Sequence, residues 1–172
     1  MSTPSHREHK EKASQRIACG VITVSDTRTE ETDKSGKLIL DLLAASGHTA
    51  NAYHIIKDDP GQIKPLLDKL LDDPALEALI FNGGTGVSRR DVTFDVVSRE
   101  IEKVLPGFGE LFRMMSFEEI GSAAMLSRAV AGTARGKAVF SVPGSSGAVR
   151  LAMEKLILPE MPHIVYELNK QP

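Results

Sequence analysis

Cysteine and tryptophan are nearly absent from this chain of 172 residues, which has one cysteine and no tryptophan. A single cysteine excludes an intrachain disulfide and any cysteine-rich zinc site. No apolar stretch reaches the roughly 18 residues that a membrane-spanning helix needs, and the polar first 16 residues lack the apolar core of a secretory signal. We therefore expect a cytoplasmic protein that has no membrane partner, with Cys19 as a small core residue.

An excess of charge of either sign is also missing, because 21 basic residues stand against 23 acidic ones. The charges are mixed along the chain and form no long basic stripe, so nucleic acid is not an expected partner. An anionic ligand would need a local positive site. A chain of this length can bury roughly 70% of its unfolded surface, which is sufficient for one core.

Short apolar runs alternate with helical patterns along the chain. The runs predict strands at residues 17–24, 50–56, 78–81 and 137–142. Thr93 is the expected N-cap of the helix after the third strand, whose apolar face would include Val96 and Val104. A further helical pattern, broken near Gly121, covers residues 108–132. This alternation predicts an α/β fold with a mostly parallel sheet covered on both faces.

The organisation of the chain points to one domain over residues 17–170. Residues 1–16 are charged and lack apolar periodicity, which predicts a flexible tail. A helical extension that becomes ordered only in an oligomer is the alternative for this segment.

Four loops leave the carboxyl ends of the predicted strands, which is where open α/β sheets bind ligands. They begin with Ser25-Asp26, Asp58-Asp59, Asn82-Gly83 and Pro143-Gly144-Ser145. Because parallel strands end at one edge of a sheet, we expect these loops to lie together. Their joint position carries more weight than any single loop.

The third loop is the richest in glycine, with Gly83, Gly84, Thr85 and Gly86 in a row. Glycines let a ligand approach the backbone, and successive amides before a helix can form a nest for an anion. An ordinary strand-to-helix turn explains the glycines equally well. The loop is not a Walker loop, because the chain has no G-x4-G-K-[ST] pattern. It is not a dinucleotide fingerprint either, because Arg89 stands where the third glycine belongs.

Charged residues follow the glycines and also occur in the second loop. Arg89 and Arg90 can each fork onto phosphate oxygens, and Asp91 would then pair with them or hold a metal ion. A weak surface Arg–Asp pair is the plainer reading. Asp58 suits Mg²⁺, which favours one or two carboxylates plus substrate phosphates, although Asp-Pro-Gly is also a common turn.

The first and last loops leave the same choice open. Asp26 is either a ligand-site carboxylate or a loop residue, and Pro143-Gly144-Ser145 is either an anion nest or a turn. Taken together, the segments resemble the MoaB/MogA family of molybdenum cofactor biosynthesis proteins, which also occurs as domains in gephyrin-like proteins. The resemblance lies in residues 23–28, 33–36, 82–86, 89–93, 106–110, 124–132 and 142–149, and residues 112–121 favour the MoaB branch.

The resemblance implies a fold, a ligand and a reaction. The fold is a three-layer α/β sandwich, and members assemble as homotrimers or homohexamers. The ligand is molybdopterin, whose terminal phosphate the active branches adenylylate with ATP and Mg²⁺, releasing pyrophosphate. Asn82 stands where many members have threonine, and we expect this change to shift a hydrogen bond.

Carried over to this chain, the family pattern assigns catalysis and the metal to Asp58 and Asp91. The pattern assigns substrate binding to Ser25, Asp26, Gly83, Gly84, Thr85, Gly86, Pro143, Gly144 and Ser145. Arg89 and Arg90 join this set because of their own charge and geometry. The alternatives are a non-catalytic molybdopterin carrier or scaffold and, more distantly, another phosphate-handling α/β enzyme. The apolar segment from Phe108 to Phe117 is the expected subunit contact.

Overall fold

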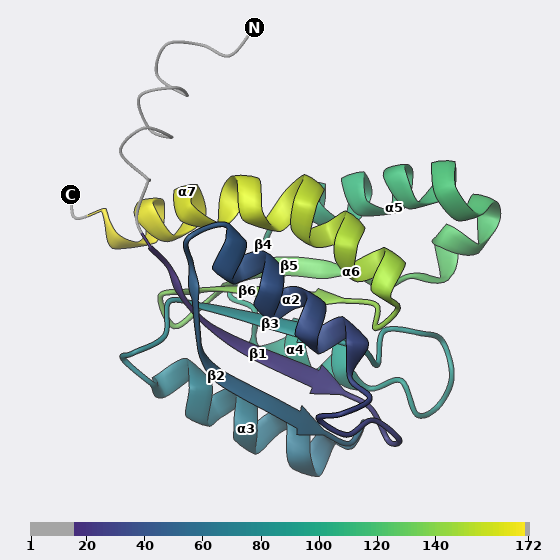
Figure 1. Cartoon of the computed structure of the whole chain (residues 1–172), viewed down its shortest axis with the longest axis horizontal. Helices are drawn as coiled ribbons and strands as arrows, with labels where there is room; N and C mark the ends of the chain where they lie inside the picture. Colours follow the sequence, from purple (N-terminus) through teal and green to yellow (C-terminus); the bar gives the residue numbers. More distant parts are fainter. Residues whose placement is uncertain (1–15, 171–172) are drawn as a thin grey trace, which may run out of the picture.

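The computed structural model describes residues 16–170, so the predicted tail lies outside the described residues except for Arg16. Within this range the strands form a sheet in the order β2-β1-β3-β6-β5-β4 (Figure 1). The strands are β1 (Ala18–Val24), β2 (Thr49–Ile56), β3 (Ala78–Asn82), β4 (Lys103–Val104), β5 (Val130–Ala134) and β6 (Lys137–Val142). Strands β2, β1, β3 and β6 pair in parallel, and β5 is antiparallel to both of its neighbours.

Helices cover both faces of this sheet (Figure 1). One face carries α2 (Lys34–Ala45), α5 (Pro106–Ile120), α6 (Ser146–Ala152), the π-helical turn η2 (Met153–Ile157) and α7 (Leu158–Asn169). The other carries α3 (Pro60–Asp72) and α4 (Thr93–Glu100). Two apolar clusters, one on each face, fill the space between the layers. The predicted three-layer α/β sandwich with a mostly parallel sheet is confirmed.

The parallel part of the sheet follows the predicted runs closely. The central strands β1, β3 and β6 are almost fully buried, as expected of parallel strands covered on both faces. Cys19 lies in this core, where burial and then the charge of Glu77 raise its pKa to about 12. The chain runs from β1 outward to β2 and then back to β3, so the direction of winding reverses between β1 and β3. Ligand crevices in open sheets lie at such reversals.

The helical prediction over residues 108–132 is wrong at its carboxyl end. Helix α5 stops at Ile120, a 3₁₀ turn η1 (Gly121–Leu126) follows, and residues 130–134 form the buried strand β5. Ala131 and Gly132 have low strand propensity, and pairing with β6 and β4 overrides it. Glycine is needed at position 132, because the Cβ of any other residue would stand only 2.4 Å from the carbonyl oxygen of Lys103 and clash with it.

Two expectations around α4 are also wrong. Thr93 is the first residue of the helix rather than its N-cap, which is Val92. The helix ends at Glu100, so Val104 is not on its apolar face but lies exposed in β4. Among the described helices, none is both long and apolar enough to cross a bilayer.

Candidate functional site

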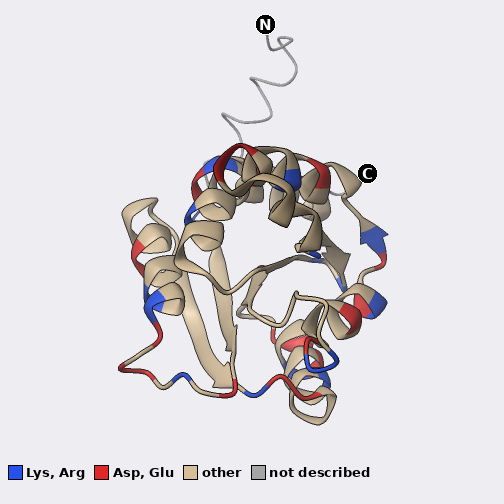
Figure 2. Cartoon of the chain, turned by 90° about the vertical axis from the view of Figure 1, so that its right-hand side faces the viewer, with Lys and Arg blue, Asp and Glu red and all other residues tan. Residues whose placement is uncertain are grey.

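The loops after β1, β2, β3 and β6 meet at one edge of the sheet. Figure 2 looks onto the edge at which β1 and β2 end and shows acidic and basic segments alternating along the loops there. The predicted convergence can be followed contact by contact, because side chains and backbone groups of each loop reach a neighbouring loop.

Asp26 joins the first three of these loops. One carboxylate oxygen accepts a hydrogen bond from the backbone N–H of Asp58 at 3.4 Å, after β2. The other pairs with the Arg90 guanidinium at 2.6 Å, after β3. Ser25 shapes the same turn, since its hydroxyl accepts from the backbone N–H groups of Thr27 and Arg28. Arg90 is 74% exposed, so its pairing leaves it open to an incoming anion.

Asp58 lies against the glycine loop. Its Oδ1 accepts hydrogen bonds from the backbone N–H of Val92 at 3.2 Å and the hydroxyl of Thr93 at 3.0 Å. Its Oδ2 stands 2.5 Å from where a Cβ on Gly84 would be. Burial raises the pKa of Asp58, the hydrogen bonds from Thr93 and Val92 lower it, and the charge of Asp91 raises it, with a net upward shift. A cation beside the Asp58 carboxylate would therefore favour its ionised form and lower its pKa again.

Asp91 takes the matching position at the next glycine. Its Oδ2 stands 2.8 Å from where a Cβ on Gly86 would be and accepts from the Ser88 backbone N–H at 2.9 Å. Arg90, the residue before Asp91, forms its ion pair with Asp26. The expected pair between Arg90 and Asp91 therefore does not form. Arg89 is exposed and, with Asp91, lines a pocket of about 310 Å³. Thr85 is buried between these two glycines.

The late loop meets the glycine loop backbone to backbone. A Cβ on Gly144 would lie 3.1 Å from the Cα of Gly83, and the Gly83 N–H donates to the carbonyl of Val142 at 2.9 Å. Ser145 caps α6, because its hydroxyl accepts from the Ala148 N–H at 3.2 Å. Half-buried Pro143 leads into this turn. All the predicted site residues thus lie in loops that touch one another.

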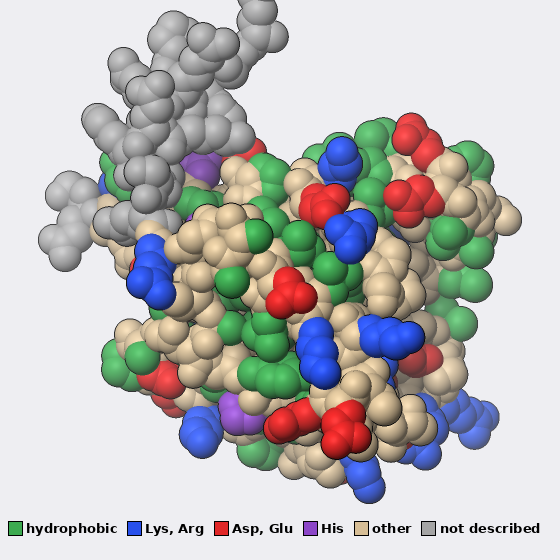
Figure 3. Space-filling view, viewed as in Figure 1, with side chains coloured by type: hydrophobic (Ala, Val, Ile, Leu, Met, Phe, Trp, Pro, Cys, Tyr) green, Lys and Arg blue, Asp and Glu red, His purple; other side chains and the backbone are tan. Residues whose placement is uncertain are grey.

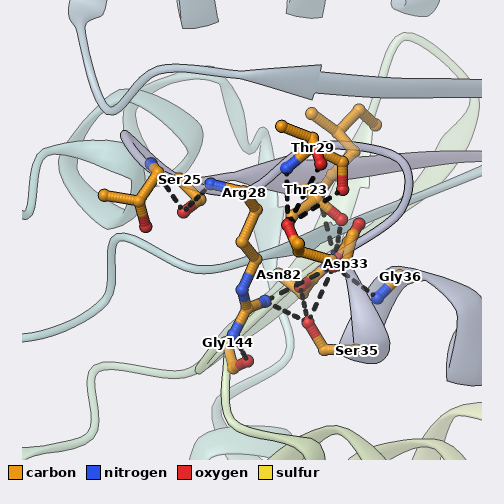
Figure 4. A network of polar contacts seen from close by, with 12 residues as sticks. Thr23, Ser25, Arg28, Thr29, Asp33, Ser35, Gly36, Asn82 and Gly144 are labelled. Atoms are coloured by element: carbon orange, nitrogen blue, oxygen red, sulfur yellow. Dashed lines mark hydrogen bonds and ion pairs between the residues drawn. The ribbon is translucent and has the colours of Figure 1, made fainter.

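A buried polar network behind the loops was not predicted (Figure 4). Arg28 donates to the carbonyl of Gly144 at 2.8 Å and to the carboxylate of Asp33 at 3.5 Å, and it also contacts the hydroxyl of Ser35. The Ser35 hydroxyl lies 2.9 Å from the side-chain oxygen of Asn82. Arg28 therefore ties the loop after β1 to the loop after β6, with the start of α2 between them.

Asn82 fits this network through both ends of its amide. Its nitrogen donates to the hydroxyl of Thr23 at 2.9 Å and its oxygen faces Ser35. The amide thus spans β1 and α2 at the point where the glycine loop begins, which accounts for a buried asparagine at the end of β3. The sequence offered one signal for these partners, the polar segment Asp-Lys-Ser-Gly, which forms the N-cap and the first turn of α2.

Asp33 is the charged centre of the network and is fully buried. Burial opposes its charge, but hydrogen bonds from Thr23, Tyr53, Gly36 and Ser35 outweigh burial and lower its pKa. The Tyr53 hydroxyl donates at 2.6 Å and the Gly36 N–H at 2.9 Å. Burial and this bond to Asp33 raise the pKa of Tyr53. The carboxylate thus stays ionised and caps α2.

We expect Asp33→Asn to lower the free energy of unfolding at neutral pH by about 1.5–3 kcal/mol, the usual value for hydrogen bonds to a charged group. Because the folded pKa of Asp33 lies below its unfolded value, its contribution is complete above about pH 4 and is lost as pH falls through the folded pKa. Urea unfolding from neutral pH down through the acid range below about pH 4 measures this slope. The exposed Asp41→Asn on α2 is the matched control. Equal acid slopes in wild type and Asp33→Asn would contradict the assignment.

Among residues 16–170, no group of three or more histidine, cysteine or acidic side chains is placed to hold a metal ion. Asp58 and Asp91 are a pair, and neighbouring Asp59 is used elsewhere, since its Oδ1 accepts from the Gly61 N–H at 3.1 Å and caps α3. A pair suits Mg²⁺ better than a metal that needs a complete protein cage.

Comparisons with known proteins found relatives that cover nearly the whole chain. A family model described as probable molybdopterin binding domain matches residues 20–163. Molybdenum cofactor biosynthesis protein B of Bacillus anthracis is 54% identical over 165 residues, which are 95% of this chain and 98% of the relative.

Two solved structures show the same likeness in three dimensions. A crystal structure of molybdenum cofactor biosynthesis protein B superposes with a TM-score of 0.89 at 53% identity, covering 92% of this chain and 99% of the other. The tungsten cofactor synthesizing protein MoaB from Pyrococcus furiosus gives 0.81 at 36% identity, covering 91% and 99%. The chain therefore belongs to the MoaB/MogA family of molybdenum cofactor biosynthesis proteins, on its MoaB branch.

Proposed function

We propose that this protein binds molybdopterin at the carboxyl edge of its sheet and adenylylates the terminal phosphate of the pterin with ATP and Mg²⁺. Family membership supports the pterin as ligand. The observation that supports the chemistry best is the placement of two carboxylates, Asp58 and Asp91, against the glycines of an amide-rich loop. A glycine loop without acidic neighbours would suit phosphate binding but not a divalent cation.

In this reaction an oxygen of the pterin phosphate attacks the α-phosphorus of ATP. The bond from that phosphorus to the oxygen bridging the β-phosphorus breaks, and pyrophosphate leaves with the electron pair. No side-chain nucleophile is required, because positioning and electrostatics dominate such transfers. The chain supplies the amides of Gly84 to Gly86 as donors, since the Gly83 N–H already donates to Val142. The exposed guanidinium groups of Arg89 and Arg90 add positive charge.

The carboxylates of Asp58 and Asp91 fit Mg²⁺ as a pair. The charge of Asp91 already raises the pKa of Asp58, so the two repel each other without a cation. Asp58 and Asp91 would hold Mg²⁺, which would supply positive charge to offset the negative charge of the phosphates. The hydrogen bonds from Val92 and Thr93 fix Asp58 on its Oδ1 side.

The direct test mixes the protein with molybdopterin, ATP and Mg²⁺ and measures adenylylated pterin and pyrophosphate. An ATP analogue with a methylene group between the α- and β-phosphorus should give no product. The analogue substituted between the β- and γ-phosphorus should still react, because the broken bond lies elsewhere. Tight pterin binding without product would favour a carrier or scaffold. Absence of pterin binding would contradict both functions.

Self-assembly is part of the proposal, and the surface of α5 supports it. Leu111, Met114, Phe117 and Ile120 recur every three residues along the helix and are between 46% and 61% exposed. Figure 3 shows apolar side chains gathered at the upper right, over the end of α5. Phe108 and Phe112, also in the expected contact segment, are instead buried in the core. Apolar surface of this kind marks interaction sites.

We expect the double variant Met114→Glu, Phe117→Glu to sediment as a smaller species than the wild-type protein, which should be a trimer or a hexamer. Charges on both positions would have to be desolvated in the contact. Analytical ultracentrifugation at working concentration measures the change, and Glu118→Gln on the same helix is the control. A wild-type monomer, or an unchanged oligomer in the variant, would contradict the assigned surface.

A further inference from the structure

Arg128 is, after Arg28, a second partly buried arginine that supports the loops at this edge of the sheet. The partners of its side chain all belong to the glycine loop or to α4. It lies between η1 and β5, and its guanidinium stands 4.9 Å from the ring centroid of Phe94. Its Nε donates to the carbonyls of Gly86 at 2.9 Å and Thr85 at 3.3 Å. One terminal nitrogen donates to the carbonyl of Asp91 at 2.6 Å, and the other makes bonds of 3.1 and 3.0 Å to the two oxygens of Asp95.

These contacts hold the loop at both of its ends. Thr85 and Gly86 precede the exposed stretch Val87 to Arg90, and Asp91 follows it. The bonds within that stretch are short-range turns. Arg90 also reaches out of the stretch, to Asp26, but Arg128 is the residue that binds both Gly86 and Asp91 and so sets the separation between them. Phe94 and the ion pair with Asp95 fix the guanidinium itself on the first turn of α4.

The carbonyls that Arg128 binds also fix the direction of the amides. A trans peptide is planar, so its N–H points opposite to its C=O. When Arg128 binds the carbonyls of Thr85 and Gly86, the N–H groups of Gly86 and Val87 point away from Arg128. The third plane can be followed further, because the N–H opposite the carbonyl of Asp91 is that of Val92, which donates to Asp58 at 3.2 Å.

We propose that Arg128 is a positioning residue for the adenylyl transfer, because its guanidinium orients three peptide planes that aim loop amides and the Asp58 carboxylate at the ligand. The proposal rests on the proposed function for the reaction, although not for the geometry. Arg128 does not need to touch substrate. The peptide group between Asp91 and Val92 accepts a hydrogen bond from Arg128 at its carbonyl oxygen and donates one to Asp58 from its N–H. The orientation of this group therefore couples Arg128 to Asp58.

The test compares Arg128→Lys and Arg128→Ala in the full-length protein with Arg135→Ala as the matched control. Arg135 is also an arginine with several acidic partners, Asp68, Asp72 and Glu100, but it lies in the turn before β6, at the opposite edge of the sheet. Lysine keeps the charge of Arg128 but not its planar fork, so Arg128→Lys separates geometry from charge and is the milder change if Arg128→Ala folds poorly.

We expect kcat per folded molecule to fall about 10-fold or more in both Arg128 variants, with KM for ATP changed by less than about 3-fold. Hydrogen exchange of the Val92 N–H should accelerate in both variants and stay unchanged in Arg135→Ala. A merely structural role predicts lower stability with unchanged kcat per folded molecule. Unchanged kcat in Arg128→Ala, unchanged Val92 exchange, or rescue by lysine would overturn the proposal.

If the proposed function itself is wrong, the activity and hydrogen-exchange measurements give a different set of results. If the wild-type protein makes no adenylylated pterin, the reaction is wrong, and the exchange of the Val92 N–H still decides whether Arg128 orients the loop. If the wild type is active and Arg128→Ala matches it, only the role of Arg128 is wrong.

Discussion

Replacing Asp58 by asparagine is expected to lower the rate of pterin adenylylation by about 10². Asparagine has the shape of aspartate and its oxygen can still accept from the Val92 N–H, so the loop should keep its conformation. Only the charge is lost, and with it the grip on a divalent cation. Turnover at saturating ATP, measured over a range of Mg²⁺ concentrations, gives the rate and the shift in Mg²⁺ dependence.

The adjacent carboxylate provides the matched control for this variant. Asp59→Asn removes the same charge one residue away, and asparagine caps a helix about as well as aspartate. Because the Asp59 carboxylate accepts from the Gly61 N–H and caps α3, its variant should turn over within about 3-fold of wild type. Equal rates for Asp58→Asn and wild type would remove Asp58 from the chemistry. Equal losses in both variants would show that Asp59 shares the cation.

The second large effect is expected on stability, from Gly83→Ala. Gly83 has φ of +110°, and a Cβ there would stand 2.1 Å from the carbonyl oxygen of Val24. That atom belongs to the backbone of β1 and cannot move cheaply. We expect a loss of roughly 3 kcal/mol or more, the sum of backbone strain and overpacking. Chemical denaturation of the variant and of wild type measures it.

Gly47→Ala separates the clash from the backbone strain. Gly47 also has positive φ, +80°, but nothing lies within 4 Å of its Cβ position. This variant should lose only about 1–2 kcal/mol, the cost of a left-handed conformation. If both variants lose the same amount, the close approach of Gly83 to β1 is not what requires glycine. Gly83→Ala should in addition weaken pterin binding, whereas Gly47→Ala should not.

The parallel half of the fold could be predicted from the sequence because its strands are short β-branched runs bounded by turn residues. Such runs are recognised without knowledge of their neighbours. Strand β5 could not be predicted in this way, since three of its five residues, Ala131, Gly132 and Ala134, are of types depleted in strands. It is a strand because β6 and β4 satisfy its backbone on both sides. Tertiary pairing overrides local propensity there.

The candidate site divides along the same line. The residues at the strand ends, such as Asp58 and Gly84, could be predicted because one rule places all strand ends together. The two arginines that support these loops, Arg28 and Arg128, could not be predicted as part of the site. Arg28 finds Gly144 across 116 residues of sequence, and Arg128 reaches Gly86 across 42. Contacts of that range leave no periodic trace in the chain.

The buried carboxylate Asp33 was missed for a different reason. An aspartate before a helix normally indicates an exposed N-cap, and Asp33 does cap α2. Its burial follows from Tyr53 of β2 and from Arg28 closing over it. The sequence could indicate the cap, but only the packed sheet shows the ion pair.

The most direct test of the account is to map the backbone amides that respond when molybdopterin binds isotope-labelled protein. A single ligand gripped by converging loops should shift the amide signals of residues 25–28, 83–92 and 143–146 together. Signals from the opposite edge of the sheet, at residues 73–77 and 135–137, should stay in place. Shifts confined to one loop, or centred on the opposite edge, would contradict the claim that these loops form one site.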